Sequence, residues 1–306
     1  MKTLLMLTLG VLSGFSVFSQ KTFDLITVSG RYGFPQTYES VYTGKATELG
    51  SMVNLAAPIQ INEKSMWFTS LNYFYWNVTN DETMPADIVN PINLHGFIFR
   101  TGIISKFSEG KELQLLFTPR LMSDLNNIDG DHFQWGGLAM YKKKFSNQLT
   151  MAFGGMYNQE LFGPYFVPLV DLDWDISERW SIAGLLPIYA KIKYKVNEKF
   201  NLGIAHFGLI TSYKLGVPAL NGDYIERSSI DLTIYARHHI AGNLYVEGRF
   251  GQALGRKYAQ YAADQKVDFA IPLVTFGDNR TQKNINFGGG LIVELRLVYS
   301  VPIPGS

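Results

Sequence analysis

The sequence predicts a closed antiparallel up-and-down β-barrel that crosses a membrane with about fourteen strands. Three observations predict it: an export-type segment at the start, alternating polar and apolar residues in many short segments, and short turns that alternate with long polar loops. Aromatic residues make up 14% of the chain and charged residues 17%, which is aromatic-rich and charge-poor for a soluble exported protein. Beyond residue 20 no apolar run is long enough for a spanning helix, so a barrel is the remaining route into a membrane.

Residues 1–19 have the pattern of a cleaved signal peptide. Lys2 precedes an apolar run over residues 4–11, and Val17 and Ser19 suit a signal-peptidase site before Gln20. We therefore expect residues 20–306 to form one outer-membrane barrel domain. An uncleaved anchor is the alternative, although the run is short for spanning. The chain has no cysteine, which excludes a lipid-modified N-terminal cysteine and a disulfide framework.

A tight connection rich in Asn, Ser and Gly recurs between alternating segments, as in β-hairpins. The connections between these hairpins are longer and polar, apart from a tight link near Pro187 and Ile188. This asymmetry is typical of outer-membrane barrels, with short periplasmic turns and long outer loops. The long connections are expected at residues 34–45, 77–92, 122–131, 158–165, 213–226 and 252–283.

The segments between these connections give fourteen strands and place both ends of the barrel sequence on the periplasmic side. Twelve strands remain the alternative if the first pair, or the short pair around Pro187, does not form. The strands are expected near 23–33, 46–60, 65–77, 93–107, 112–122, 132–143, 148–157, 165–175, 179–187, 190–197, 200–212, 227–239, 243–252 and 284–300.

The segment LVDLDWDIS, residues 169–177, has an aspartate at every second position with apolar residues between. Alternate side chains of a strand lie on opposite faces, so these acids share one face. Folding through the next two turns brings the lysines of AKIKYKV two strands away, about 10 Å from the acids. The expected neighbours are Asp175 with Lys195, Asp173 with Lys193 and Asp171 with Lys191.

The strands near the C-terminus repeat this pattern of charge on one face and apolar residues on the other. In a membrane barrel the charged face lines the lumen and the apolar face meets lipid. A soluble sheet with solvated charges is the alternative. The predicted lumen-facing charged residues are Asp171, Asp173, Asp175, Lys191, Lys193, Lys195, Arg227, Asp231, Arg237, Glu247, Arg249, Glu294 and Arg296.

The chain resembles a family of uncharacterised outer-membrane β-barrel proteins of Bacteroidota, grouped as domains of unknown function. The segments that carry the resemblance are SVFSQ, SERWSI, NEKFNL, LLPIYAKIKYKVNEKFNLG and the last strand NFGGGLIVELRLVYS. It implies an outer-membrane barrel and brings no catalytic signature.

Catalytic and metal sites have weak support in the sequence, and we expect neither, nor any cofactor. His95 and His132 lie near the predicted outer rim, where a hydrolase would need an acid or a serine beside one of them. Residues 124–132, DLNNIDGDH, could bind calcium, but their spacing departs from the known loop pattern, and Asn, Asp and Gly also form ordinary turns.

The predicted function is therefore a pore for small solutes with a charged lumen. A structural or assembly barrel with a closed lumen is the alternative, and an outer-membrane hydrolase is a third candidate. The expected partners are outer-membrane lipid, the barrel assembly machinery and small solutes. The formal net charge of +1 gives no reason to expect nucleic acid.

Overall fold

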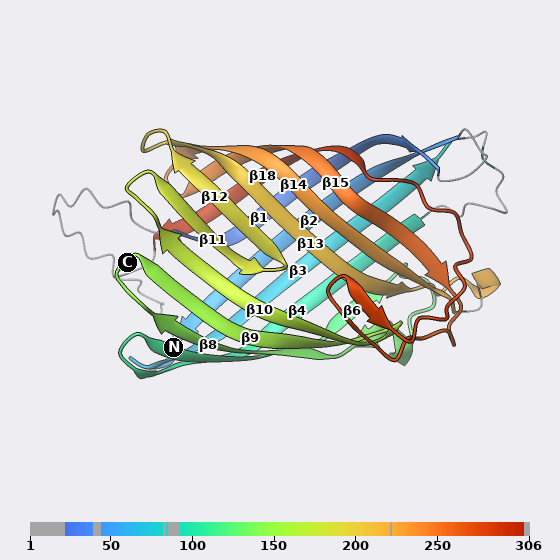
Figure 1. The fold of residues 1–306 in the computed structure, drawn as a ribbon, viewed down its shortest axis with the longest axis horizontal. Helices are drawn as coiled ribbons and strands as arrows, with labels where there is room; N and C mark the ends of the chain where they lie inside the picture. The colour runs from blue at the N-terminus through green and yellow to red at the C-terminus, as the bar shows by residue number, and fades with distance from the viewer. Residues whose placement is uncertain (1–21, 39–43, 82–83, 85–91, 221, 303–306) are drawn as a thin grey trace, which may run out of the picture.

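Figure 1 shows one sheet rolled into a closed barrel. The structure is a computed structural model that describes residues 22–38, 44–81, 84, 92–220 and 222–302. The predicted signal peptide, residues 1–19, lies outside the described residues. Within them, no helix is long and apolar enough to cross a bilayer.

The barrel closes because its first and last strands pair. β1 (Thr22–Thr37) runs antiparallel to β18 (Gly290–Pro302), from the pair Thr22 with Pro302 to the pair Gly33 with Ile292. The wall strands between them each pair antiparallel with their neighbours. The predicted closed antiparallel barrel of fourteen strands is confirmed, and the alternative of twelve strands is wrong.

Two adjacent positions of the fourteen in the wall are each filled by an interrupted strand, β5 with β6 and β7 with β8. β5 (Lys111–Phe117) and β6 (Arg120–Ser123) both pair with β4 (Ile92–Ser108), and Pro119, which has no N–H for the ladder, lies in the break between them. β7 and β8 continue the wall on the other side of this interrupted strand. The remaining wall strands are β2 (Lys45–Gln60), β3 (Ser65–Asn80), β4 (Ile92–Ser108), β5 (Lys111–Phe117), β6 (Arg120–Ser123), β7 (Phe133–Gln134), β8 (Gly136–Lys144), β9 (Leu149–Glu160), β10 (Gly163–Asp175), β11 (Trp180–Leu186), β12 (Tyr189–Lys195), β13 (Phe200–Lys214), β14 (Tyr224–Ala241) and β15 (Leu244–Tyr261).

Short turns lie at one end of the barrel, here called the turn end, and most long connections lie at the other, the loop end (Figure 1). Two predicted loops are wrong. Residues 158–165 form no long loop, because β9 continues to Glu160 and β10 begins at Gly163. The longest connection begins after Tyr261 rather than at residue 252, and it carries a small hairpin, β16 (Phe269–Ile271) with β17 (Val274–Phe276).

The outer face of the wall is apolar. Large apolar side chains point outward along the strands, and Ile234 and Leu295 are 64% and 63% exposed. In the turn half of β14 they alternate with buried polar side chains such as Asp231 and Thr233. An exposed belt of this kind is stable in contact with lipid.

The loop-end halves of β13, β14 and β15 depart from this alternation. Thr211, Ser212 and Tyr213 are all buried, and so are the four consecutive residues 258–261. Side chains on both faces are therefore covered, which places these strand ends inside the barrel.

One face of the inward strand ends packs on β2–β4 and the other on the inner face of β8–β10. We call the first contact the inner core and the second the overlap core. The inner core consists of Tyr38, Ala46, Phe74, Trp76, Val78, Met84, Ile92, Leu94, Ile98, Met122, Tyr213, Leu215, Ile225, Tyr258 and Phe287. The overlap core consists of Met140, Ala152, Phe162, Tyr165, Val167, Leu169, Tyr224, Ala259, Tyr261, Val267 and Ala270.

The inward turn occurs beside the shortest hairpin of the wall. β11 and β12 end at a tight turn, Pro187 and Ile188, and stop short of the loop end, whereas β10 and β13 continue (Figure 1). β10 pairs with β11 only as far as Val170, and β13 pairs with β12 only as far as Phe207.

We predict that Leu295→Lys lowers the free energy of unfolding by about 2–4 kcal/mol, because it places a charge in the apolar belt of the middle wall. Ile59→Lys is the matched control: Ile59 is 57% exposed but lies next to the turn at residues 61–64, so its cost is about 0–1 kcal/mol. Equilibrium urea unfolding in lipid vesicles measures both. Equal costs would contradict a bilayer around the middle of the wall.

Candidate functional site

The interior of the barrel contains three clusters of charged side chains. Each is centred on a carboxylate with 4% exposure or less: Glu48, Glu160 or Glu247. Each cluster joins side chains from several strands. The clusters are named after these residues.

The Glu48 cluster lies at the boundary of the inner core. Glu48 on β2 approaches Arg256 of β15 at 2.8 Å, Arg227 of β14 at 3.3 Å and Arg31 of β1 at 3.5 Å. Arg31 also donates to Asp231 on β14. A buried carboxylate with three guanidiniums compensates charges that would be costly alone, and it binds the inward ends of β14 and β15 to β1 and β2.

An indole ring supports this cluster. The Arg227 guanidinium lies 3.5 Å from the ring centre of Trp76, and its Nε donates to the Tyr258 hydroxyl at 2.9 Å. Trp76 lies against Gly50 on the neighbouring strand, where an added Cβ would come within 2.6 Å of the ring. Gly50 therefore makes the room in which Trp76 supports Arg227.

The Glu160 cluster holds the inward end of β13. Glu160 accepts hydrogen bonds from the Ser212 N–H at 2.8 Å and the Ser212 hydroxyl at 2.7 Å, and it pairs with Arg120 of β6 at 2.7 Å. Gln134 donates to the Ser212 carbonyl at 2.9 Å. These side chains satisfy backbone groups that a neighbouring strand would otherwise satisfy.

The Glu247 cluster lies nearer the turn end. Glu247 on β15 contacts Arg249 at 2.7 Å, Lys191 of β12 at 2.8 Å, Arg296 of β18 at 3.5 Å and Arg237 of β14 at 3.8 Å. Charged contacts that join β12, β14, β15 and β18 therefore lie in the barrel interior at this level.

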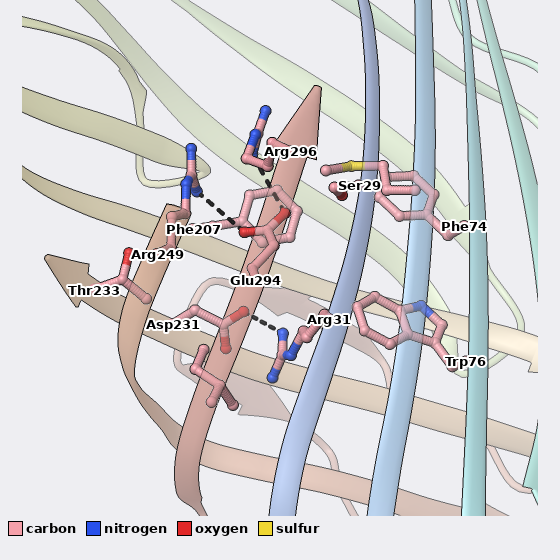
Figure 2. A pocket seen from close by; sticks show the side chains of 12 residues that line it. Ser29, Arg31, Phe74, Trp76, Phe207, Asp231, Thr233, Arg249, Glu294 and Arg296 are labelled. Carbon is pink, nitrogen blue, oxygen red and sulfur yellow. Dashed lines mark hydrogen bonds and ion pairs between the residues drawn. The ribbon is translucent and has the colours of Figure 1, made fainter. Parts of the chain in front are cut away.

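Figure 2 shows the space between the Glu48 and Glu247 clusters. Glu294 lies 3.6 Å from Arg249 and 3.5 Å from Arg296, while Arg31 and Asp231 meet on the other side. The cavity between them measures about 30 Å³, which has room for one or two water molecules.

Eight of the residues predicted to line the lumen lie in these clusters or in the cavity between them: Lys191, Arg227, Asp231, Arg237, Glu247, Arg249, Glu294 and Arg296. The other five lie nearer the turn end on β10 and β12. All five are partly exposed, as is Lys191: Asp171, Asp173, Asp175, Lys193 and Lys195.

The predicted pairing of the aspartates with the lysines is wrong by two residues. β10 and β11 have the predicted register, with Asp175 opposite Ser181. Ser181 then lies opposite Lys193 rather than Lys195, because only Pro187 and Ile188 connect β11 to β12. The lysine ends are also engaged elsewhere: Lys191 contacts Glu247, and Lys195 contacts Glu198 at 2.6 Å.

Five central residues were not predicted as site residues. Arg31 and Glu48 lie at positions that simple alternation assigns to the inner face of their strands. The alternating pattern of the sequence could therefore have identified both as lumen-facing residues. Glu160 lies within the segment predicted as a loop. Arg120 and Arg256 lie beside a strand break and a bulge, where alternation gives no reliable face.

Residues 124–132 form a structural connection. His132 Nδ1 lies 2.8 Å from Asp129 Oδ1 and closes a single turn of 3-10 helix, η1 (Gly130–His132). The hydrogen bond from His132 lowers the pKa of Asp129 below its ordinary value. Asp124 accepts from the Gly216 N–H at 2.9 Å, which ties this connection to the end of β13. Among the described residues no group of three His, Asp or Glu side chains is arranged to hold a metal ion.

We predict that Glu48→Gln lowers the free energy of unfolding by about 3–5 kcal/mol, because it leaves three buried guanidiniums without their shared carboxylate. The control is Glu198→Gln, which removes an ion pair whose carboxylate is 82% exposed and costs about 0–1 kcal/mol. Urea unfolding in vesicles measures both. A cost for Glu48→Gln as small as that of the control would show that the cluster does not hold the strand ends.

The barrel is similar to solved outer-membrane proteins at low sequence identity. An outer-membrane channel from Pseudomonas putida F1 is 10% identical, with 94% of this chain and 100% of that chain covered and a TM-score of 0.45. The TodX monoaromatic hydrocarbon channel is 9% identical, with 93% and 91% covered and a TM-score of 0.43. The KdgM porin, in complex with oligogalacturonate, is 7% identical, with 90% and 99% covered and a TM-score of 0.35.

At these scores nothing about substrate follows from the likeness. No curated protein matches the chain. One family matches residues 28–271, which is most of the sequence. The predicted relation to a family of unknown function is confirmed, while an origin in Bacteroidota stays a prediction. The chain belongs to the family described as Domain of unknown function (DUF6268).

Proposed function

We propose that this protein is an outer-membrane channel for small solutes and that the inward ends of β13–β15 form its closed gate. The observation that carries this proposal is the difference between the two halves of the barrel. In the turn half, the inward charged side chains of β10 and β12 are partly exposed; in the loop half, the interior is filled by two apolar cores and the Glu48 and Glu160 clusters.

The apolar belt supports a location in a membrane. The closed sheet leaves few strand edges, and the outward side chains are those that lipid accepts. Trp67 and Trp180 are exposed just after short turns, where amphipathic rings are favoured at a membrane interface. Lipid and the assembly machinery that inserts barrels are the partners that such a location requires.

The partly exposed charges support an aqueous vestibule at the turn end. Asp171, Asp173 and Asp175 lie along one wall, and Lys191 and Lys193 lie two strands away. Charges of both signs favour polar solutes and set ion selectivity by their balance. The vestibule ends at the Glu247 cluster, where a carboxylate with no exposed surface joins β12, β14, β15 and β18.

A structural barrel with a permanently filled interior is the second candidate. The observation that favours it is the complete burial of Glu48 among three arginines. The hydrolase candidate has less support, because the contacts of His132 close a turn and His95 accepts or donates only to the Tyr73 hydroxyl at 2.9 Å among its described hydrogen bonds.

We predict that Glu160→Ala increases the conductance of single barrels in planar bilayers. The substitution leaves the Ser212 N–H and Arg120 without their shared acceptor, so the inward end of β13 loses its main polar anchor. Glu198→Ala is the control, since it removes a glutamate at a turn far from the gate. A barrel that stays silent in wild type, Glu160→Ala and Glu48→Gln forms would contradict the channel and favour the structural candidate.

We also predict that Lys193→Glu in the Glu160→Ala background shifts selectivity toward cations, because it changes the vestibule charge by two units within a narrow aqueous space. Lys199→Glu makes the same change of charge at an exposed turn and should have a smaller effect. The reversal potential in a salt gradient measures both. Equal shifts for the two variants would place the conducting path outside the predicted vestibule.

A further inference from the structure

The wall of the barrel is incomplete beside β11 and β12. Residues 163–169 of β10 and 208–213 of β13 extend past this short hairpin, and among the residues that the structure describes no wall strand pairs with either segment on the side of β11 and β12. At roughly 3.3 Å per residue the opening runs for about 20 Å along the strands. Its lower edge is the turn at Ile188, whose carbonyl accepts from the Gly208 N–H at 2.7 Å.

The opening leads directly into the overlap core. The β13 end passes behind β10, so outer-face side chains such as Ile210 and Tyr224 pack on inner-face side chains such as Val167 and Leu169. This contact is apolar on both sides. The overlap-core residues that a molecule from the bilayer would meet beyond the opening are therefore apolar or aromatic.

The hairpin of β16 and β17 covers this opening. It pairs with β10 through Tyr165 and Ala270, and the Val267 N–H donates to the Phe162 carbonyl at 2.8 Å. Ala270 of the hairpin and Val267 just before it are buried in the overlap core. The hairpin is short and is joined to the wall by few backbone contacts, so its displacement costs little compared with unfolding of the barrel.

The outward side of the hairpin is apolar, which places it against lipid. Leu273 at the tip is 81% exposed, and Phe269 and Phe276 stack at 4.3 Å with about two fifths of their surface exposed. Exposed apolar side chains at this position are favourable in a bilayer and unfavourable in water.

Charged side chains around Arg280 cover the loop-end side of the overlap core. Arg280 contacts Glu226 at 2.7 Å, donates to the Tyr224 hydroxyl at 3.1 Å and lies 4.2 Å from the ring centre of Tyr261. Asp278 accepts from the same guanidinium at 2.9 Å. Apolar molecules therefore have an easier path from the side of the barrel than from its loop end.

We propose that the opening between β10 and β13 is a lateral access path by which small uncharged apolar molecules pass from the bilayer into the overlap core, with the β16–β17 hairpin as its movable cover. This inference rests on the proposed function, because it names the class of molecule that the channel receives. The acidic face of β10 begins at Asp171, so the molecule leaves the apolar path where the aqueous vestibule begins.

The test uses the absence of cysteine in the chain. Leu169→Cys places one thiol at the inner end of the path, where the side chain is 2% exposed. N-phenylmaleimide is an uncharged aromatic reagent that dissolves in the bilayer, and a trimethylammonium methanethiosulfonate is a charged reagent confined to water. Both are applied to the protein in phosphatidylcholine vesicles, with and without deletion of residues 269–276.

The deletion removes the cover and joins Asp268 to Gly277, residues that already lie together because the Asp268 N–H donates to the Phe276 carbonyl at 3.0 Å. We expect N-phenylmaleimide to react about tenfold faster or more after the deletion, and the charged reagent to react at an unchanged rate. Leu94→Cys is the control: it is equally buried but lies in the inner core, behind β13–β15, and its rate should not change.

If N-phenylmaleimide reacts at the same rate with and without the hairpin, or if both reagents accelerate together, the lateral apolar path is wrong. If the deletion prevents folding, the double substitution Phe269→Ala with Phe276→Ala takes its place. It removes the stacked rings, and N-phenylmaleimide should then label Leu169→Cys faster than in the barrel with both rings present. The labelling needs no conductance. Faster labelling in a barrel that stays silent in bilayers would support the path and contradict the channel, whereas conductance with unchanged labelling would overturn the path alone.

Discussion

A barrel wall in a bilayer must satisfy the hydrogen bonds of every strand edge, and in this protein two strands are too short to do so. β11 and β12 stop at Pro187 and Ile188, which leaves residues 208–213 of β13 without a paired strand on one side, until Lys214 pairs with Ser123 of β6. The strand end turns inward, where Glu160 accepts from the Ser212 N–H and Gln134 donates to the Ser212 carbonyl. The two cores and the closed loop end follow from this displacement.

The inward strand ends are held by charged contacts at the edges of apolar packing. Glu48 joins three strands through arginines, and Glu160 joins β13 to β6 through Arg120. Ion pairs are strong where water is excluded, and their members are well solvated when water enters. Such contacts are well suited to a seal with two states, because the cost of separating the charges falls as the interior fills with water.

Alternation of side chains predicted the regular parts of the wall and failed where the wall is irregular. The shift at β11 and β12 is two residues, so Lys193 kept its predicted face although its neighbour changed. On β15, Gly255 has φ of +57° at a bulge, which returns Arg256 and Tyr258 to the interior against simple alternation. The role of Glu160 could not be predicted, because it depends on contact with Ser212 at the inward end of β13, which is far away in the sequence.

The polarity of β10 changes at the point where the wall becomes complete. Tyr165, Val167 and Leu169 face the overlap core, and the aspartates begin at Asp171, opposite Leu185 of β11. A carboxylate two residues nearer the loop end would be buried against β13 and β14 without water, which is costly. The alternating segment at residues 169–177 is therefore the part of β10 that pairs with β11 and faces the proposed vestibule. The residues before it are apolar because they pack on the inward ends of β13–β15.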